Sequence, residues 1–294
     1  METVASSLKW AELALVQASA ELLESCKVDS QWLLAHVLQR NGAWLRAWPD
    51  HELTAEQWQQ YQLLVERRSA GEPVAYLTGS QGFWTLELAV TEDTLVPRPD
   101  TELLVEQVLA QADAELASVE RLNMLDLGTG SGAIALALAS ERPHWNITAT
   151  DIHGPTLAVA ARSSEALNLP IQLIQSAWFE QLGGQQFHII ASNPPYIEDQ
   201  DAHLQGVGVR YEPIRALASG ADGLDDIRII VAQSSAHLHA GGWLLLEHGC
   251  DQGGAVRALM TASGFAQVVT VQDLADRDRV TLGQWPSNQG ACHA

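Results

Sequence analysis

The chain has 294 residues, of which 47% are apolar and 18% charged, an ordinary globular composition and a length typical of about two domains. Its 16 Lys and Arg residues against 36 Asp and Glu residues give a formal net charge of −20, and most of this excess lies after residue 85. Two of the basic residues are lysines, Lys9 and Lys27. A protein that binds nucleic acid through its main domain needs the opposite sign, so the charge disfavours such a ligand.

The sequence predicts neither a targeting segment nor a metal site. No stretch reaches the roughly 18 apolar residues that a membrane-spanning helix needs, and the first residues have no basic and then apolar region, so no secretory signal is expected. Cys26, Cys250 and Cys292 are odd in number and lack C-x-x-C spacing, which argues against a disulfide framework and a zinc cluster. We therefore expect a cytoplasmic protein without a metal site.

Residues 1–72 are predicted to form a small helical domain. Leu13, Val16 and Ala20 have the spacing of one helix face, and a second apolar stripe comprises positions 32, 33, 36 and 37. Thr54 and Gln57 have the spacing of a capping box that opens a third helix. We expect the core of this domain to contain five tryptophans: Trp10, Trp32, Trp44, Trp48 and Trp58.

Residues 73–98 are predicted to link two domains through a β-hairpin and a proline-rich segment. Apolar runs at 76–78 and 83–90 flank the sequence Gly-Ser-Gln-Gly at 79–82, which predicts two strands joined by a four-residue turn. Pro97 and Pro99 then disfavour helix at the positions before each proline.

Residues 99–286 alternate between helix and strand patterns. Helices are expected at 100–117, 133–140, 155–167 and 225–240, and strands at 123–127, 146–151, 171–174, 187–192 and 242–247. This order predicts an α/β fold with a doubly wound parallel sheet. Two further strands at 265–271 and 279–284 are separated by a short loop and are expected to be antiparallel, and residues 287–294 are expected to be a disordered tail.

A glycine-rich loop between a strand and a helix is the strongest binding motif. Gly128, Gly130 and Gly132 allow the backbone to approach a ligand closely, and Asp151 ends the next strand, where a carboxylate accepts hydrogen bonds from ribose hydroxyls. Asp126 precedes the first glycine by two residues. A carboxylate there repels a pyrophosphate but suits a cationic sulfonium, so the motif favours S-adenosylmethionine over a dinucleotide.

Asn193, Pro194, Pro195 and Tyr196 directly follow the strand predicted at 187–192, at the same carboxyl edge of the sheet. The two prolines hold the backbone rigid, so that the Asn193 side-chain oxygen and the Pro194 carbonyl form a fixed pair of acceptors for one planar NH2 group. Tyr196 supplies a flat face against which a conjugated group stacks. The motif therefore predicts methylation of a carboxamide or, alternatively, of the exocyclic amine of adenine or cytosine in nucleic acid.

These motifs, in this order, resemble those of the bacterial release factor glutamine methyltransferases. The matching stretches are residues 68–79, 95–102, 126–139, 192–197, 211–213 and 279–283. Asn-Pro-Pro-Tyr by itself is shared with DNA amino-methyltransferases, whereas Pro-Arg-Pro-Asp-Thr-Glu before a G-x-G-x-G loop is more specific. The resemblance implies an enzyme that methylates the side-chain amide nitrogen of the Gly-Gly-Gln glutamine in class-1 peptide chain release factors, with S-adenosylhomocysteine as coproduct. Neither nucleic acid nor a membrane is an expected partner.

The resemblance also implies a seven-stranded class I methyltransferase sheet, a helical domain that recognises the release factor, and the roles of particular residues. Asn193 is implied to contact both cofactor and glutamine, with Pro194, Pro195 and Tyr196 completing the glutamine pocket. Ala177 stands where relatives often carry an acidic residue. The implied S-adenosylmethionine site comprises Asp126, Gly128, Thr129, Gly130, Ser131, Gly132, Asp151 and Trp178. For Trp178, a half-buried loop aromatic is an equally good interpretation, and Arg98 either steers the substrate loop or pairs with an acidic neighbour.

Overall fold

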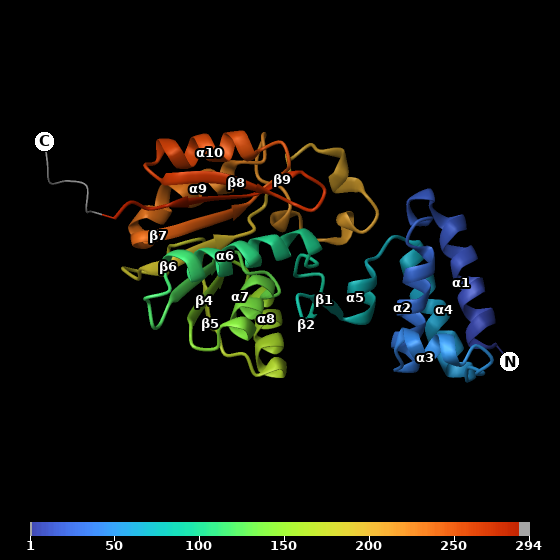
Figure 1. Ribbon diagram of the computed structural model, residues 1–294. Coiled ribbons are helices and arrows are strands. Elements are labelled where there is room, and N and C mark those ends of the chain that lie inside the picture. Colours follow the sequence, from blue (N-terminus) through green and yellow to red (C-terminus); the bar gives the residue numbers. More distant parts are fainter. Residues whose placement is uncertain (1, 288–294) are drawn as a thin grey trace, which may run out of the picture. The chain divides into compact units, whose positions relative to one another are not determined.

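The computed structural model describes residues 2–287 and divides the chain into two compact units (Figure 1). Unit 1 comprises the chain up to Ser80 together with Ala202–Glu212, and unit 2 comprises Gln81–Asp201 and the chain from Pro213 onward. The sequence predicted a boundary near residue 72 but gave no sign that 202–212 belongs to the first unit. Most of the tail predicted as disordered, residues 288–294, lies outside the described residues.

Unit 1 is helical, as predicted. Its core surrounds Tyr61, which is fully buried and donates its hydroxyl to the Ser30 carbonyl at 3.0 Å. The expected capping box is present, because Thr54 and Gln57 exchange side-chain and backbone hydrogen bonds. The helices are α1 (Val4–Ala18), α2 (Cys26–Leu38), α3 (Gly42–Ala47), α4 (Ala55–Ser69) and α5 (Val74–Thr78).

The predicted apolar faces of unit 1 are partly wrong. The face of α1 that packs against the core contains Ala11 and Leu15. Leu13 and Val16 lie on another face of the helix and are exposed. Three of the five tryptophans pack against the core, but the side chains of Trp32 and Trp48 are 64% and 59% exposed. Helical spacing identifies an apolar stripe, and only packing decides which side of a stripe is covered. The buried residues of α1 are Val4, Ser7, Ala11 and Leu15, and those of α2 are Asp29, Ser30, Leu33, Leu34, Ala35 and Leu38.

The hairpin exists and its second strand lies within the predicted 83–90, but its predicted first strand and turn were wrong. Residues 76–78 belong to α5, where Ala75 and Leu77 are buried, and Gly79 ends that helix in the left-handed conformation with φ 77°. The strands are β1 (Ser80–Phe83) and β2 (Leu86–Ala89), so the turn falls at 84–85, with Trp84 at φ 57°. Gly79 is therefore a helix C-cap rather than a turn residue.

Unit 2 contains a seven-stranded sheet in the order β5-β4-β3-β6-β7-β9-β8. The first five strands are mutually parallel, and β9 is antiparallel to both β7 and β8, as the sequence predicted for the last pair. The order reverses between β3 and β6, which is where ligands bind in open α/β sheets. The strands are β3 (Asn123–Leu127), β4 (Asn146–Asp151), β5 (Gln172–Gln175), β6 (Phe187–Ser192), β7 (Leu238–Glu247), β8 (Ala266–Gln272) and β9 (Asp278–Gln284).

Helices cover both faces of this sheet (Figure 1). Successive residues of β3 point to opposite cores: Met124 packs into the cluster that contains α6 and α7, and Leu125 into the cluster that contains α9 and α10. Burial on both faces explains the uninterrupted apolar stretches 189–191 in β6 (Phe187–Ser192) and 243–246 in β7 (Leu238–Glu247). The helices of this unit are α6 (Glu102–Glu115), α7 (Ala133–Glu141), α8 (Gly154–Leu167), α9 (Asp225–Ser234) and α10 (Gly253–Ala262).

One strand boundary differs from its prediction by four residues. The predicted helix 225–240 ends at Ser234, and β7 begins at Leu238 because Leu238 pairs with Phe187 of β6. The register then shifts before Trp243 pairs with Ile189, and Gly241 lies in this irregular stretch with φ 82°. Across residues 2–287, no helix is both long and apolar enough to cross a membrane.

Candidate functional site

A cavity of about 290 Å³ in unit 2 collects residues from the carboxyl ends of four parallel strands. Gly128, Asp151, Ser176 and Asn193 follow or end β3, β4, β5 and β6 respectively, and the segment before α6 closes the cavity with Pro97. Because parallel strands end at one edge of a sheet, the fold brings together motifs that are far apart in the sequence. Both motifs identified in the sequence thus contribute to a single cavity.

The glycine loop is built around the Asp126 carboxylate. Asp126 is fully buried, and its Oδ2 accepts hydrogen bonds from Thr129 Oγ1 at 2.6 Å and from the backbone N–H of Ala135 at 3.2 Å. Burial raises the pKa of Asp126 to about 7. The carboxylate therefore joins the loop to the first turn of α7. Asp126 is not among the residues that line the cavity. Its direct contact with a cofactor stays a prediction.

The glycines are required where neighbouring side chains approach the loop. A Cβ at Gly128 would lie 3.3 Å from the ring of Trp178, and one at Gly132 would lie 3.0 Å from Leu136 Cδ1. Both glycines have positive φ, of 69° and 88°. A side chain at either position would be strained and would also displace its neighbour.

Asp151 is fixed with its carboxylate beside the glycine loop. Oδ2 accepts the backbone N–H of Gly130 at 3.1 Å, and Oδ1 accepts the backbone N–H of His153 at 2.9 Å. Burial raises the pKa of Asp151. Each carboxylate oxygen has a second lone pair, so both can still accept a hydrogen bond from a vicinal diol. This pair of acceptors fits the ribose of an adenosine-containing cofactor.

Trp178 lines the cavity in a strained backbone conformation. Its φ is 48°, and Ser176 Oγ donates to its carbonyl at 2.9 Å and accepts from the backbone N–H of Gln181 at 3.0 Å. Left-handed conformations at bulky residues cost free energy and persist where surrounding contacts enforce them. The cavity thus receives a large apolar surface beside Gly128, which fits the adenine end of the same cofactor.

Asn193 leaves the end of β6 with its amide group oriented. Its Nδ2 donates to Thr101 Oγ1 at 3.0 Å, and Thr101 lies at the start of α6, 92 residues earlier in the chain. Within residues 2–287, nothing donates a hydrogen bond to Asn193 Oδ1 or to the Pro194 carbonyl. Two acceptors are therefore available at the edge of the cavity, which is the pattern that one planar NH2 group requires.

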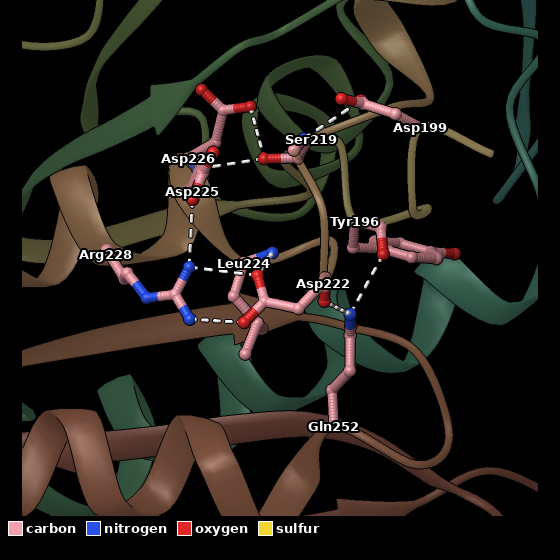
Figure 2. A network of polar contacts seen from close by, with 10 residues as sticks. Tyr196, Asp199, Ser219, Asp222, Leu224, Asp225, Asp226, Arg228 and Gln252 are labelled. Atoms are coloured by element: carbon pink, nitrogen blue, oxygen red, sulfur yellow. Dashed lines mark hydrogen bonds and ion pairs between the residues drawn. The ribbon is translucent and has the colours of Figure 1, made fainter. Parts of the chain in front are cut away.

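The far end of the motif is held from two other loops (Figure 2). Gln252 Nε2 donates to the Tyr196 carbonyl at 2.9 Å and to the Asp222 carbonyl at 3.2 Å, as Figure 2 shows, and the Tyr196 N–H donates to the Leu217 carbonyl. Gly223 packs so closely that a Cβ there would lie 2.1 Å from the Tyr196 oxygen. The loop over 217–223 therefore fixes the motif's backbone and tolerates only glycine at this contact.

A buried carboxylate completes the site. Glu247 ends β7, next to β6 in the sheet, and Tyr196 donates its hydroxyl to Glu247 Oε1 at 3.4 Å. The Thr101 hydroxyl also hydrogen-bonds to this carboxylate, and the positive charge of Arg279 faces it. Burial raises the pKa of Glu247 to about 7, and burial together with the Glu247 charge raises the pKa of Tyr196.

Eight of the twelve site residues predicted from the sequence line the cavity: Gly128, Thr129, Gly130, Ser131, Asp151, Trp178, Asn193 and Pro195. The other four, Asp126, Gly132, Pro194 and Tyr196, lie adjacent to it in the same two motifs. Sequence reasoning missed Glu247 and the roles of Thr101 and Arg279. An acidic residue at the carboxyl end of a strand next to 187–192 was the signal that could have identified Glu247. Arg98 also lines the cavity.

Comparison with known proteins identifies both units. The PrmC N-terminal domain matches residues 6–79, and the methyltransferase small domain matches residues 99–208. Among curated proteins, release factor glutamine methyltransferases from Xylella fastidiosa, Pseudomonas aeruginosa and Escherichia coli are 49%, 51% and 47% identical to this chain. The alignments cover 93%, 89% and 94% of this chain and 98%, 93% and 98% of those proteins.

Solved structures with lower sequence identity share the fold. The hMettl16 catalytic domain, solved in complex with an RNA hairpin of a 3′UTR, superposes with a TM-score of 0.54 at 15% identity, covering 76% of this chain and 83% of that one. A methyltransferase from Pyrococcus furiosus gives a TM-score of 0.50 at 17% identity, covering 76% and 98%. The predicted α/β class I methyltransferase fold is therefore confirmed.

Proposed function

We propose that this chain, which belongs to the release factor glutamine methyltransferase family, transfers a methyl group from S-adenosylmethionine to the side-chain amide nitrogen of a release factor glutamine. The glutamine is that of the Gly-Gly-Gln motif of class-1 peptide chain release factors. We place the reaction in the cytoplasm, where this substrate acts. The observation that carries the proposal is the pair of available acceptors, Asn193 Oδ1 and the Pro194 carbonyl, beside the glycine loop and Asp151.

The chemical difficulty lies in the substrate nitrogen. The lone pair of a carboxamide nitrogen is delocalised into the carbonyl, so the nitrogen is a poor nucleophile. Asn193 and Pro194 bind its two protons and thereby fix the direction in which the nitrogen faces the cavity. Tyr196 packs beside them with its backbone held at both N–H and carbonyl, which keeps these acceptors in place. Fixed acceptors require no reorganisation during the reaction, which is how preorganised polar groups lower a barrier.

S-adenosylmethionine supplies an electrophilic methyl group on a sulfonium when it is bound. The Asp151 carboxylate is positioned to accept the ribose hydroxyls, and Trp178 with Gly128 offers the apolar surface for the base. Three acidic residues, Asp93, Asp151 and Asp226, line the cavity together with two arginines, Arg98 and Arg215. The remaining excess of negative charge suits a cationic ligand.

We further propose that unit 1 binds the release factor. Its exposed large apolar side chains offer contact area for a protein partner, and they are Leu13, Val16, Leu23, Val28, Trp32, Trp48, Leu63 and Tyr211. Trp32→Ser should raise KM for an intact release factor severalfold and leave KM for a short Gly-Gly-Gln peptide unchanged. An unchanged KM for the intact factor would remove Trp32 from the binding surface.

The test uses S-adenosylmethionine labelled in its methyl group, with intact release factor, DNA duplex and RNA duplex as separate substrates. We expect label in the release factor alone, and none in a release factor whose Gly-Gly-Gln glutamine is replaced by asparagine. Label in nucleic acid with none in release factor would favour the alternative, methylation of an exocyclic base amine. The net charge of −20 argues against that outcome.

A further inference from the structure

Glu247 is almost completely buried and lies outside both sequence motifs. Its residue is 1% exposed, and its Oε2 is buried without a hydrogen-bond partner among residues 2–287. Buried carboxylates are costly unless they are paired, so one retained beside a catalytic motif calls for a physical explanation. The register of the sheet provides the position: Ser192 of β6 pairs with Leu246 of β7, so the next residues, Asn193 and Glu247, leave the same edge side by side.

Thr101 lies between Asn193 and Glu247, and the direction of its hydroxyl proton determines which group donates in each of its two hydrogen bonds. The Thr101 hydroxyl has one hydrogen, and it hydrogen-bonds to Glu247 on one side and accepts from Asn193 Nδ2 at 3.0 Å on the other. An ionised carboxylate can only accept, so the Thr101 hydrogen points to Glu247. The Thr101 oxygen must then accept from Asn193, which turns the Asn193 NH2 group away from the cavity and its Oδ1 toward it.

We propose that Glu247 is a positioning residue: through the Thr101 hydroxyl it commits the Asn193 amide to present its oxygen, rather than its NH2 group, to the substrate glutamine. This inference rests on the function proposed above, because only a substrate that donates NH2 protons requires an acceptor at Asn193. Glu247 contacts neither the substrate nor the cofactor cavity directly. Its direct hydrogen bond from the Tyr196 hydroxyl holds the other end of the same motif.

Protonation of Glu247 reverses the chain of hydrogen bonds. A protonated carboxyl donates to Thr101, whose hydrogen then turns toward Asn193, so the amide flips and offers NH2 to a substrate group that is also a donor. Burial raises the pKa of Glu247 to about 7, so this reversal is expected near neutral pH. The other groups that face the carboxylate are Tyr196, Arg279 and Asp100; Arg279 favours the ionised form and Asp100 opposes it.

The enzymatic test compares variants that alter this chain of hydrogen bonds and leave the cofactor site intact. Glu247→Gln and Thr101→Val should each lower kcat for release factor methylation at least tenfold, with the Kd for S-adenosylmethionine changed less than threefold. Thr101→Ser, which restores the hydroxyl, should recover most of the turnover lost in Thr101→Val. Glu106→Gln, the same change on the exposed side of α6, is the matched control. Wild-type kcat in both Glu247→Gln and Thr101→Val would overturn the inference.

The pH profile separates positioning from a general loss of structure. In the wild-type enzyme kcat should fall as pH drops through about 7, and Glu247→Gln should be low and flat over the same range. Asp126→Asn removes the other buried carboxylate with a pKa raised to about 7 and should keep the acidic limb. An acidic limb that survives in Glu247→Gln and disappears in Asp126→Asn would contradict the assignment.

A spectroscopic measurement tests the inference without any substrate. In protein labelled with 15N-asparagine, the Asn193 side-chain NH2 signals, assigned through Asn193→Ser, should shift with an apparent pKa near 7 in the wild type and remain constant in Glu247→Gln. If the wild-type enzyme fails to methylate release factor while this shift is present, the proposed function fails and the positioning stands. If methylation proceeds but the Asn193 signals show the same pH dependence in the wild type and in Glu247→Gln, the positioning fails and the proposed function stands.

Discussion

The glycine loop and the Asn-Pro-Pro-Tyr segment leave neighbouring strands at the same edge of the sheet, but different contacts hold them. The loop is held locally: Asp126 binds Thr129 and Ala135, which are 3 and 9 residues away in the chain. The Asn-Pro-Pro-Tyr segment is held from afar, since Asn193 binds a residue 92 positions away and Tyr196 binds residues 51 and 56 positions away. The first region is held mainly within the β3–α7–β4 segment, where Asp151 also binds Gly130, whereas the second is held by residues from more distant parts of the chain.

A buried carboxylate supports each of the two regions, but its role differs between them. Asp126 and Glu247 are both buried carboxylates with pKa values raised to about 7, and each has one oxygen without a partner among residues 2–287. Asp126 supports the shape of the glycine loop, and in our proposal Glu247 sets the orientation of the Asn193 amide. We therefore expect changes on the β3 and β4 side to alter cofactor affinity, and changes on the β6 and β7 side to alter turnover.

The largest expected effect comes from the motif itself. Asn193→Ala removes one of two acceptors for the substrate amide and should lower kcat by about 10²- to 10³-fold, the usual cost of losing one preorganised catalytic hydrogen-bonding group. The Kd for S-adenosylmethionine, measured by calorimetry, should change less than tenfold. Turnover at the wild-type rate would show that Asn193 does not bind the glutamine amide.

A complementary change on the cofactor side should reverse that pattern. Asp151→Ala removes the acceptor for the ribose hydroxyls and should weaken S-adenosylmethionine binding by about 10- to 100-fold, since hydrogen bonds to charged groups contribute about 1.5–3 kcal/mol each. At saturating cofactor, kcat should remain within threefold of the wild type. Asp151→Asn, which keeps one acceptor oxygen, should fall between the two. A large fall in kcat at saturation would break the division between the two regions.

Two glycines with similar backbone conformations test how the motif is supported. Gly223 and Gly183 have φ of 70° and 57°, but a Cβ at Gly223 would lie 2.1 Å from the Tyr196 oxygen and one at Gly183 would meet nothing within 4 Å. Gly183→Ala should cost about 1–2 kcal/mol of unfolding free energy in urea, from backbone strain alone. Gly223→Ala should cost about 1–3 kcal/mol more and also lower kcat. Equal costs would mean that the loop moves without disturbing Tyr196.

A global effect is expected in the pH dependence of stability. Because burial raises the pKa values of Asp126 and Glu247 to about 7, the folded protein keeps protons that the unfolded chain releases near pH 4. The free energy of unfolding should therefore decrease as pH rises from about 4 to about 7, by about 3–4 kcal/mol for each group. Urea unfolding at pH 5 and pH 8 should show a smaller difference in Asp126→Asn and Glu247→Gln than in Glu106→Gln. An identical difference in all three variants would show that burial does not raise the pKa values of these carboxylates.

Local patterns predicted much of the fold because their causes are local. The strands at 146–151 and 187–192 match β4 and β6 because short segments rich in β-branched and apolar residues describe strands. The hairpin was misplaced because an apolar stretch beside glycine suits both a strand with a turn and a short helix with a C-cap. The strand at 242–247 was too short because its first residues are specified by pairing with Phe187 rather than by their own composition.

The sequence by itself determined the cofactor loop, the acceptor motif and their common edge, since each is a short segment whose residue types and strand–helix order define its chemistry. The tertiary structure alone decided that Thr101 meets Asn193, that Glu247 meets Tyr196, that Gly223 packs against Tyr196, and that 202–212 belongs to unit 1. These contacts join segments dozens of residues apart, and the spacing of residues along a chain carries no information about which distant side chains will share a buried hydrogen bond.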